Sequence, residues 1–234
     1  MPADARTERL GRNLAAVESR LEAACRAAGR ERSDLVLIAV TKTFPADDVR
    51  RLAALGVHDF GENRDQEAAP KAAALRDVAL GWHFVGQLQT NKCRSVASYA
   101  DAVHSVDRLR LVEVLGRAAE QAGRTVDVFV QVSLDDDQAR GGATSEELPA
   151  LADAVAGASG IRLVGVMAVA PVAADAERAF ERLATIAARL RVDHPDAVSI
   201  SAGMSGDLEA AIAAGATHVR IGTALLGDRA PVVR

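Results

Sequence analysis

Short runs of β-branched and apolar residues alternate along this chain with stretches rich in Ala, Leu, Arg and Glu at helical spacing. Such an alternation predicts parallel strands joined by helices. Eight strand candidates within 234 residues is the number found in a (β/α)8 TIM barrel. The predicted strands are Leu35–Thr41, Val57–Phe60, Trp82–Val85, Ala102–Val106, Val126–Val132, Ile161–Val169, Val198–Ser201 and His218–Thr223, and the predicted helices between them include Asp107–Ala122, Ser145–Ala158 and Ala173–Val192.

The two ends of the chain refine this prediction. A long amphipathic helix is expected over Ala5–Ala28, before the first strand. After the eighth strand, Gly227 and Pro231 disfavour a second long helix. We therefore expect the N-terminal helix to cover the place of a missing eighth helix, in a single domain spanning residues 1–234. An open doubly wound sheet is the alternative, but the GxGxxG and GxxxxGK[ST] fingerprints that often accompany it are absent from the sequence.

Composition narrows the function classes. The net charge of −4 offers no basic field for a nucleic-acid backbone. No apolar run approaches the roughly 18 residues of a membrane span, and the start, Met1–Leu10, lacks the apolar segment of a signal peptide. Cys25 and Cys93 lie far apart, without a CxxC pair, and the five histidines form no metal-binding motif. These features predict a cytoplasmic protein that binds neither nucleic acid, membrane nor metal.

A lysine follows the first predicted strand directly. Active sites of (β/α)8 barrels lie at the carboxyl ends of the strands. Lys42 would therefore place its amine at the barrel mouth, partly removed from water. Desolvation lowers the pKa of a lysine, as a Schiff-base lysine requires. The alternative is a lysine at a strand end that merely extends into solvent.

Small and hydroxyl-bearing residues follow the seventh and eighth predicted strands. The segment Ser201–Asp207 and the pair Gly222 and Thr223 would bring backbone N–H groups and hydroxyls together, and phosphate sites in these barrels often use these two loops. The alternative is that Ser205 caps a helix and Gly222 turns the chain. With Lys42 on the adjoining first strand, the pattern favours an aldehyde that carries a phosphate. A barrel that binds another phosphate ester, without a covalent role for Lys42, stays open.

Five motifs in the same order make the sequence resemble the pyridoxal-phosphate homeostasis proteins, single-domain relatives of the alanine-racemase barrel. They are Ala39–Lys42, Phe60–Asn63, Trp82–Gly86, Ser201–Asp207 and Val219–Thr223. The resemblance implies that Lys42 forms a Schiff base with pyridoxal 5′-phosphate (PLP). It also implies that Ser201, Ser205, Gly222 and Thr223 hold the phosphate, that Arg220 faces the pyridine nitrogen, and that Asn63 lines the ring.

Some positions depart from the family pattern. Gln87 replaces a usual proline, Ala202 a larger apolar residue, and Arg64-Asp65 an aromatic-aliphatic pair. The loop Asp135–Gly142 keeps the acidic, basic, glycine order, with Arg140 in place of a typical lysine. Its acidic run is read as a solvated loop and not as a metal site.

By resemblance, the expected role is PLP homeostasis: holding the cofactor, handing it to apo enzymes that need it, and buffering its effect on amino-acid pools. A guanidinium beside the pyridine nitrogen keeps its proton and leaves the ring a weak electron sink, which suits a carrier better than a transaminase. Without the domain that builds the dimer in the related racemases, a monomer is expected. The alternative is a PLP-dependent amino-acid racemase, which needs a second acid/base besides the lysine. Tyr99 is poorly placed for that role, which leaves Cys93 and His83 as conceivable candidates.

Overall fold

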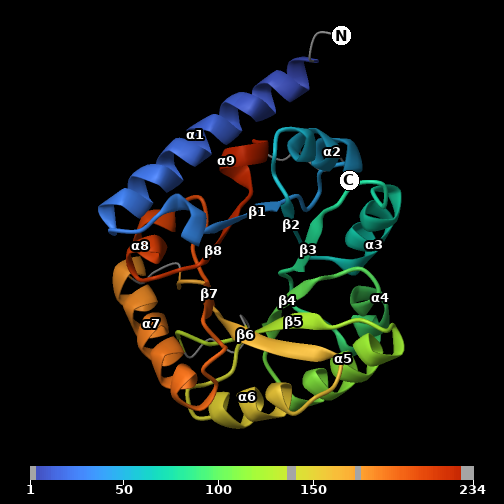
Figure 1. The fold of residues 1–234 in the computed structure, drawn as a ribbon, viewed down its shortest axis with the longest axis vertical. Helices are drawn as coiled ribbons and strands as arrows, with labels where there is room; N and C mark the ends of the chain where they lie inside the picture. The colour runs from blue at the N-terminus through green and yellow to red at the C-terminus, as the bar shows by residue number, and fades with distance from the viewer. Residues whose placement is uncertain (1–3, 136–140, 172–174, 228–234) are drawn as a thin grey trace.

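A computed structural model describes residues 4–135, 141–171 and 175–227 of the chain. Its strands form a closed parallel barrel in which each pairs with the next along the chain and β8 pairs with β1 (Figure 1). This confirms the predicted (β/α)8 barrel. The strands are β1 (Val36–Val40), β2 (Asp59–Glu62), β3 (Gly81–Phe84), β4 (Ala102–Val106), β5 (Val126–Gln131), β6 (Ile161–Met167), β7 (Ser199–Ser201) and β8 (His218–Ile221).

The helices surround the barrel and bury their apolar faces against the outer side of the strands (Figure 1). They are α1 (Ala5–Ala27), α2 (Ala46–Ala54), α3 (Asp65–Ala74), α4 (Cys93–Ala97), α5 (Leu109–Gln121), α6 (Leu148–Ala156), α7 (Ala176–Asp193), α8 (Leu208–Ala213) and α9 (Thr223–Leu226). No helix in the described part of the chain is long and apolar enough to cross a membrane.

Strand register decides which side chains enter the barrel. Side chains alternate between the two faces of a strand. Val40 pairs with Gly61, and Gly61 pairs with His83, so these three residues share one face. A Cβ at position 61 would lie 3.0 Å from Ile38 Cγ2, which identifies that face as the crowded interior. The intervening residues, such as Ala39 and Phe60, pack outward against the helices.

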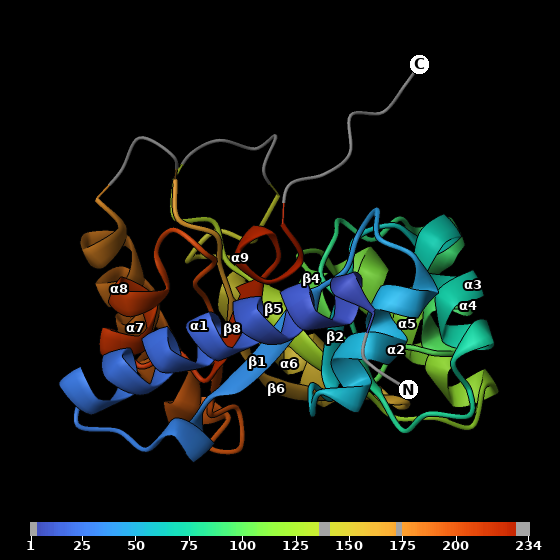
Figure 2. The ribbon, with the colours of Figure 1, turned by 90° about the horizontal axis from the view of Figure 1, so that it is seen from above.

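The N-terminal helix fills the expected gap. Figure 2 shows α1 lying across the outside of β1 and β8, and it packs against α8, α9 and α2. Asn13 Nδ2 donates to the Leu225 carbonyl at 2.9 Å, and Arg6 Nη1 donates to the Leu226 carbonyl at 3.1 Å. These bonds satisfy carbonyls at the end of α9, which helix ends otherwise leave unpaired. Arg6 also forms an ion pair with Asp48 of α2. The α1 helix thus stands in for a full eighth helix.

Several elements are shorter than the sequence predicts, and local capping explains two of the differences. The α7 helix begins at Ala176 because the Asp175 side chain accepts a hydrogen bond from Glu177 N at 3.0 Å. Ahead of α6, Thr144 and Glu147 exchange side-chain and backbone hydrogen bonds, which holds those residues in a turn. The described structure ends at Gly227, so Pro231 lies outside it.

Candidate functional site

The residues predicted to form the site lie at or just beyond the carboxyl ends of four adjacent strands. Barrel closure places the strands in the order β7, β8, β1, β2, so their ends form one continuous arc (Figure 1). In sequence, Lys42 follows β1 and Asn63 follows β2, while Ser201 ends β7 and Arg220 lies within β8. Lys42 is two residues beyond the inward-facing Val40 and is half-buried.

A tight turn carries Lys42. Phe44 N donates to the Thr41 carbonyl at 3.0 Å, and Thr43 has a left-handed φ of 70°. This conformation is costly for a β-branched residue. Thr43 N donates to Glu67 Oε2 of α3 at 2.9 Å, which fixes the turn against the neighbouring unit. The backbone on both sides of Lys42 is therefore held in place.

A buried ion pair supports the same turn from behind. Lys71 Nζ of α3 lies 2.6 Å from Glu62 Oε1 and donates to the Thr41 carbonyl at 2.8 Å. Thr41 Oγ1 donates to the same Glu62 oxygen at 2.7 Å. Burial raises the pKa of the Glu62 carboxyl above its usual value, although the Lys71 ammonium opposes the shift. These residues join the ends of β1 and β2 to α3.

Backbone donors gather at the loops that follow β7 and β8. Within the described residues, the N–H groups of Ser205, Gly206, Gly222 and Thr223 have no hydrogen-bond acceptor. Ser205 Oγ accepts a bond from Ala224 N at 3.4 Å, which places the two loops together. A Cβ added at Gly222 would lie 3.5 Å from the Val40 carbonyl of β1. A group of unpaired N–H donors next to two hydroxyls matches the needs of a phosphate.

Arg220 is buried under this arc and held by three hydrogen bonds. Its Nη1 donates to the Ser201 carbonyl at 2.9 Å and to Ser201 Oγ at 2.6 Å, and its Nη2 donates to the Ala168 carbonyl at 2.9 Å. Burial lowers the pKa of Arg220 to about 10, so the guanidinium remains charged at neutral pH. Its Nε–H and one Nη2–H have no acceptor among the described residues. The Ser201 hydroxyl is fully buried and bonded to Arg220, so here it positions the arginine.

Asn63 lies at the edge of an open pocket of about 500 Å³ that Gln87 and Lys92 also line. A Cβ at Gly86 would lie 2.1 Å from the Asn63 carbonyl, so only glycine allows the loops after β2 and β3 to approach this closely. Nearby, Asp65 accepts a bond from Ser95 Oγ at 2.7 Å and lies 3.7 Å from Lys92 Nζ. Asp65, one of the residues that depart from the family pattern, thus joins α3 to α4.

The whole sequence contains only three lysines, Lys42, Lys71 and Lys92. Lys71 is buried in its ion pair, and Lys92 is paired with Asp65 outside the strand layer. Lys42 alone of the three lies just after a barrel strand, two residues beyond the inward-facing Val40. This distribution distinguishes the Lys42 amine from the other two.

The candidates for a second acid/base lie away from the arc. Tyr99 OH is 3.5 Å from Asp65 Oδ1 in the outer layer, and burial raises the pKa of this phenol above its usual value. Cys93 is buried in α4, its Sγ donates to the Gln89 carbonyl at 3.8 Å, and burial raises the pKa of the thiol to about 11. His83 lies inside the barrel and is hydrogen-bonded to Asp59 and His104. The stretch 136–140, which includes Arg140, lies outside the described residues.

Sequence reasoning missed the polar barrel interior. The histidines are dispersed along the chain, yet the rings of His83, His104 and His218 come within 5.1–6.4 Å of one another, centroid to centroid. Strand alternation was the available signal, because it places these three residues on the inner face. No group of acidic, histidine or cysteine residues in the described parts of the chain is arranged to hold a metal ion.

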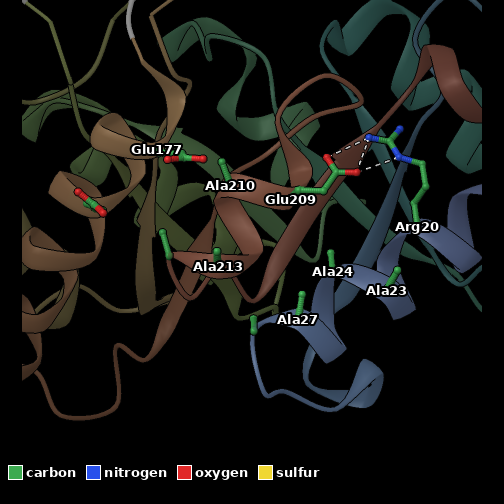
Figure 3. Close-up of a pocket in the computed structure, with 11 residues that line it drawn as sticks. Arg20, Ala23, Ala24, Ala27, Glu177, Glu209, Ala210 and Ala213 are labelled. Atoms are coloured by element: carbon green, nitrogen blue, oxygen red, sulfur yellow. Dashed lines mark hydrogen bonds and ion pairs between the residues drawn. The ribbon is translucent and has the colours of Figure 1, made fainter.

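A surface groove of about 660 Å³ lies away from the arc. It runs between α1, α7 and α8, is lined largely by alanines, and has the bidentate Arg20–Glu209 ion pair at one end (Figure 3). Its residues offer an apolar floor with a few carboxylates, and none of the predicted site residues lines it. The groove is therefore separate from the candidate site.

The buried histidines predict an acid-sensitive fold. Burial lowers the pKa of His218 to about 4 and that of His104 well below 6.5. In the unfolded chain both rings take up a proton near pH 6.5, so the unfolded state binds more protons as the pH falls. We expect His218 alone to remove about 3 kcal/mol from the free energy of unfolding between pH 6.5 and 4. Urea unfolding across this range measures the slope, and His218→Asn should flatten it. An identical slope in the variant would contradict the prediction.

Comparison with known proteins agrees with this geometry. Residues 12–230 match the family model described as alanine racemase, N-terminal domain. A pyridoxal phosphate homeostasis protein of Pseudomonas aeruginosa is 44% identical, with 94% of this chain and 96% of that protein covered. This chain belongs to the pyridoxal phosphate homeostasis protein family. The family member from Mycobacterium tuberculosis is 43% identical, with 96% of this chain and 94% of that protein covered. The structure of PipY from Synechococcus elongatus with PLP bound has a TM-score of 0.81 at 36% identity, covering 93% of this chain and 100% of PipY.

Proposed function

We propose that this chain binds PLP as a Schiff base on Lys42 and acts as a carrier in PLP homeostasis. The observation that carries the proposal is the arc of β7, β8, β1 and β2, which joins Lys42 at the end of β1 to unpaired N–H donors and a buried guanidinium. Family relatives bear the name of pyridoxal phosphate homeostasis proteins, and PipY has been solved with PLP. Bound PLP supplies an aldehyde that condenses with an amine and a ring that withdraws electrons.

Each part of the arc has a defined task in this proposal. The Lys42 amine makes the covalent bond, and the N–H groups of Ser205, Gly206, Gly222 and Thr223 surround the phosphate. Ser201 holds the Arg220 guanidinium in place. Arg220 directs its remaining N–H donors to the pyridine nitrogen, while Asn63 lines the ring. The charged guanidinium retains its proton, so the ring nitrogen stays unprotonated and electron withdrawal is weak.

The positions of the candidate acid/base groups favour a carrier over a racemase. A racemase working with two bases needs an acid/base on each face of the substrate carbon. Tyr99 and Cys93 lie in the helical layer with raised pKa values, and His83 is engaged inside the barrel. We propose that the protein has no dedicated catalytic activity, and that it acts as a single-domain monomer that delivers PLP to apo enzymes by transient contact.

Reduction with borohydride tests the covalent site. After incubation with PLP and reduction, we expect peptide mass spectrometry to find one adduct per chain, on Lys42. With only three lysines in the sequence, each can be scored individually. No adduct, or labelling on Lys92 and the amino terminus instead, would overturn the proposal in favour of another phosphate ligand.

A transfer assay separates the carrier from the racemase. The PLP-loaded protein is mixed with an apo PLP-dependent enzyme, and recovery of that enzyme's activity is followed. We expect recovery of the acceptor and no turnover of free amino acids. Failure to reactivate any acceptor, together with amino-acid racemisation at enzyme-like rates, would establish the racemase alternative.

A further inference from the structure

Five side chains form an unbroken line of hydrogen bonds through the barrel interior. Asp59 Oδ1 is 3.0 Å from His83 Nε2, and His83 Nδ1 is 2.9 Å from His104 Nε2. His104 Nδ1 is 2.9 Å from Ser201 Oγ, which accepts from Arg220 Nη1 at 2.6 Å. These residues come from β2, β3, β4, β7 and β8, so the line crosses from one side of the barrel to the other.

The two ends of the line fix its direction. A guanidinium only donates hydrogen bonds, and an ionised carboxylate only accepts them. His83 must therefore donate from Nε2 to Asp59, which leaves its Nδ1 as an acceptor when the ring is neutral. His104 must then donate from Nε2 to His83 and accept at Nδ1 from the Ser201 hydroxyl. Every proton along the line is assigned by its ends, with both imidazoles in the Nε2–H form.

We propose that Asp59, His83 and His104 are positioning residues for the Ser201–Arg220 pair, joined to it in one directional hydrogen-bond chain that begins at the far end of the barrel. The proposal rests on the proposed function for the ligand that Arg220 faces. Because the Ser201 hydroxyl donates its hydrogen bond to His104, the lone pairs of its oxygen are available to accept from Arg220. The guanidinium is thereby held with its remaining donors directed away from the chain.

Burial isolates the chain from water along most of its length. His104 and Ser201 are 0% exposed, whereas the Asp59 side chain is 33% exposed. The ring of Phe129 stacks on His104 with centroids 4.2 Å apart, which hinders rotation of the imidazole. His218 of β8 also faces His83 and His104, but its Nδ1 is 2.8 Å from Thr217 Oγ1, outside the chain.

The Asp59 end is built around a glycine. Gly81 pairs with Asp59 in the register of β2 and β3. A Cβ at position 81 would lie 2.5 Å from Asp59 Oδ1 and 3.6 Å from His83 Nε2. Any larger residue would displace the carboxylate from the imidazole that it holds. The last acceptor of the chain therefore depends on the absence of a side chain at position 81.

Nitrogen-15 NMR of the protein without PLP tests the direction of the chain. We expect His83 and His104 both to show the Nε2–H signature at neutral pH. Asp59→Ala removes the terminal acceptor, so at least one ring should change to the Nδ1–H form. Asp59→Asn keeps an acceptor oxygen and should retain the Nε2–H forms. Asp127→Ala removes a carboxylate paired with Arg162 outside the chain and should change neither ring.

PLP affinity is the second readout. We expect Asp59→Ala to weaken PLP binding about fivefold, the worth of one ordinary hydrogen bond, while the Lys42 adduct still forms. The proposed hydrogen-bond chain would be wrong if His83 and His104 were in the Nδ1–H form in the unaltered protein. It would also be wrong if Asp59→Ala changed neither the tautomers nor the PLP affinity. The tautomers are measured without PLP, so the hydrogen-bond chain can be confirmed even if no Lys42 adduct forms. The two proposals are therefore tested separately.

Discussion

Lys42→Ala is expected to abolish the borohydride-trapped adduct and to weaken PLP binding by more than about 100-fold, because the covalent bond adds to the noncovalent contacts of the phosphate and ring. The other two lysines should not replace it. Lys71 is held at 2.6 Å from Glu62 in a buried ion pair, and Lys92 pairs with Asp65 on the outer side. Mass spectrometry of the reduced protein measures the adduct yield, and a PLP titration measures the affinity.

Two controls separate the covalent bond from the rest of the site. Lys42→Arg keeps the positive charge but offers no amine, so it should behave as Lys42→Ala in the trapping experiment. Pyridoxamine 5′-phosphate carries the phosphate and ring without an aldehyde, so it should bind the unaltered protein and Lys42→Ala with similar affinity. An adduct of undiminished yield in Lys42→Ala would contradict the prediction.

Lys71→Met is expected to lower the free energy of unfolding by about 3–5 kcal/mol at neutral pH, because it leaves the buried Glu62 carboxylate without its counter-charge. Glu62 is 1% exposed, and its second oxygen, Oε2, has no hydrogen-bond partner within the described structure. Burial already raises the pKa of this carboxyl. Removing Lys71 raises the Glu62 pKa further. Above pH 4.5, the usual pKa of glutamate, the folded variant therefore keeps a proton on Glu62 that the unfolded chain has lost. The destabilisation should therefore grow as the pH rises.

Urea unfolding at pH 5 and pH 8 measures this effect. The double variant Glu62→Gln/Lys71→Met carries no charge at either position of the pair and should recover much of the loss at pH 8. Lys92→Met removes a more exposed cation, which lies 3.7 Å from Asp65, and should cost at most about 1 kcal/mol. A loss in Lys71→Met that is the same at both pH values would contradict an unpaired Glu62 carboxylate as its cause.

Strand alternation made the fold and the position of Lys42 predictable. Lys42 lies two residues beyond the end of β1, and the carboxyl ends of parallel strands meet at one face of a barrel. The Thr41–Glu62–Lys71 cluster was not predictable in this way, because Lys71 lies on a helix and reaches back to a strand end. The contact of His104 with Ser201 could not be predicted from strand alternation either, because only closure of the barrel brings β4 and β7 face to face.

The scarcity of lysine bears on the chemistry that surrounds a reactive aldehyde. Of 28 basic residues, 25 are arginines, and a guanidinium that holds its proton does not condense with aldehydes under mild conditions. A protein that carries PLP, as we propose for this chain, is exposed to such an aldehyde throughout its life, and each surface amine would be a place for stray modification. Arginine supplies positive charge without that hazard.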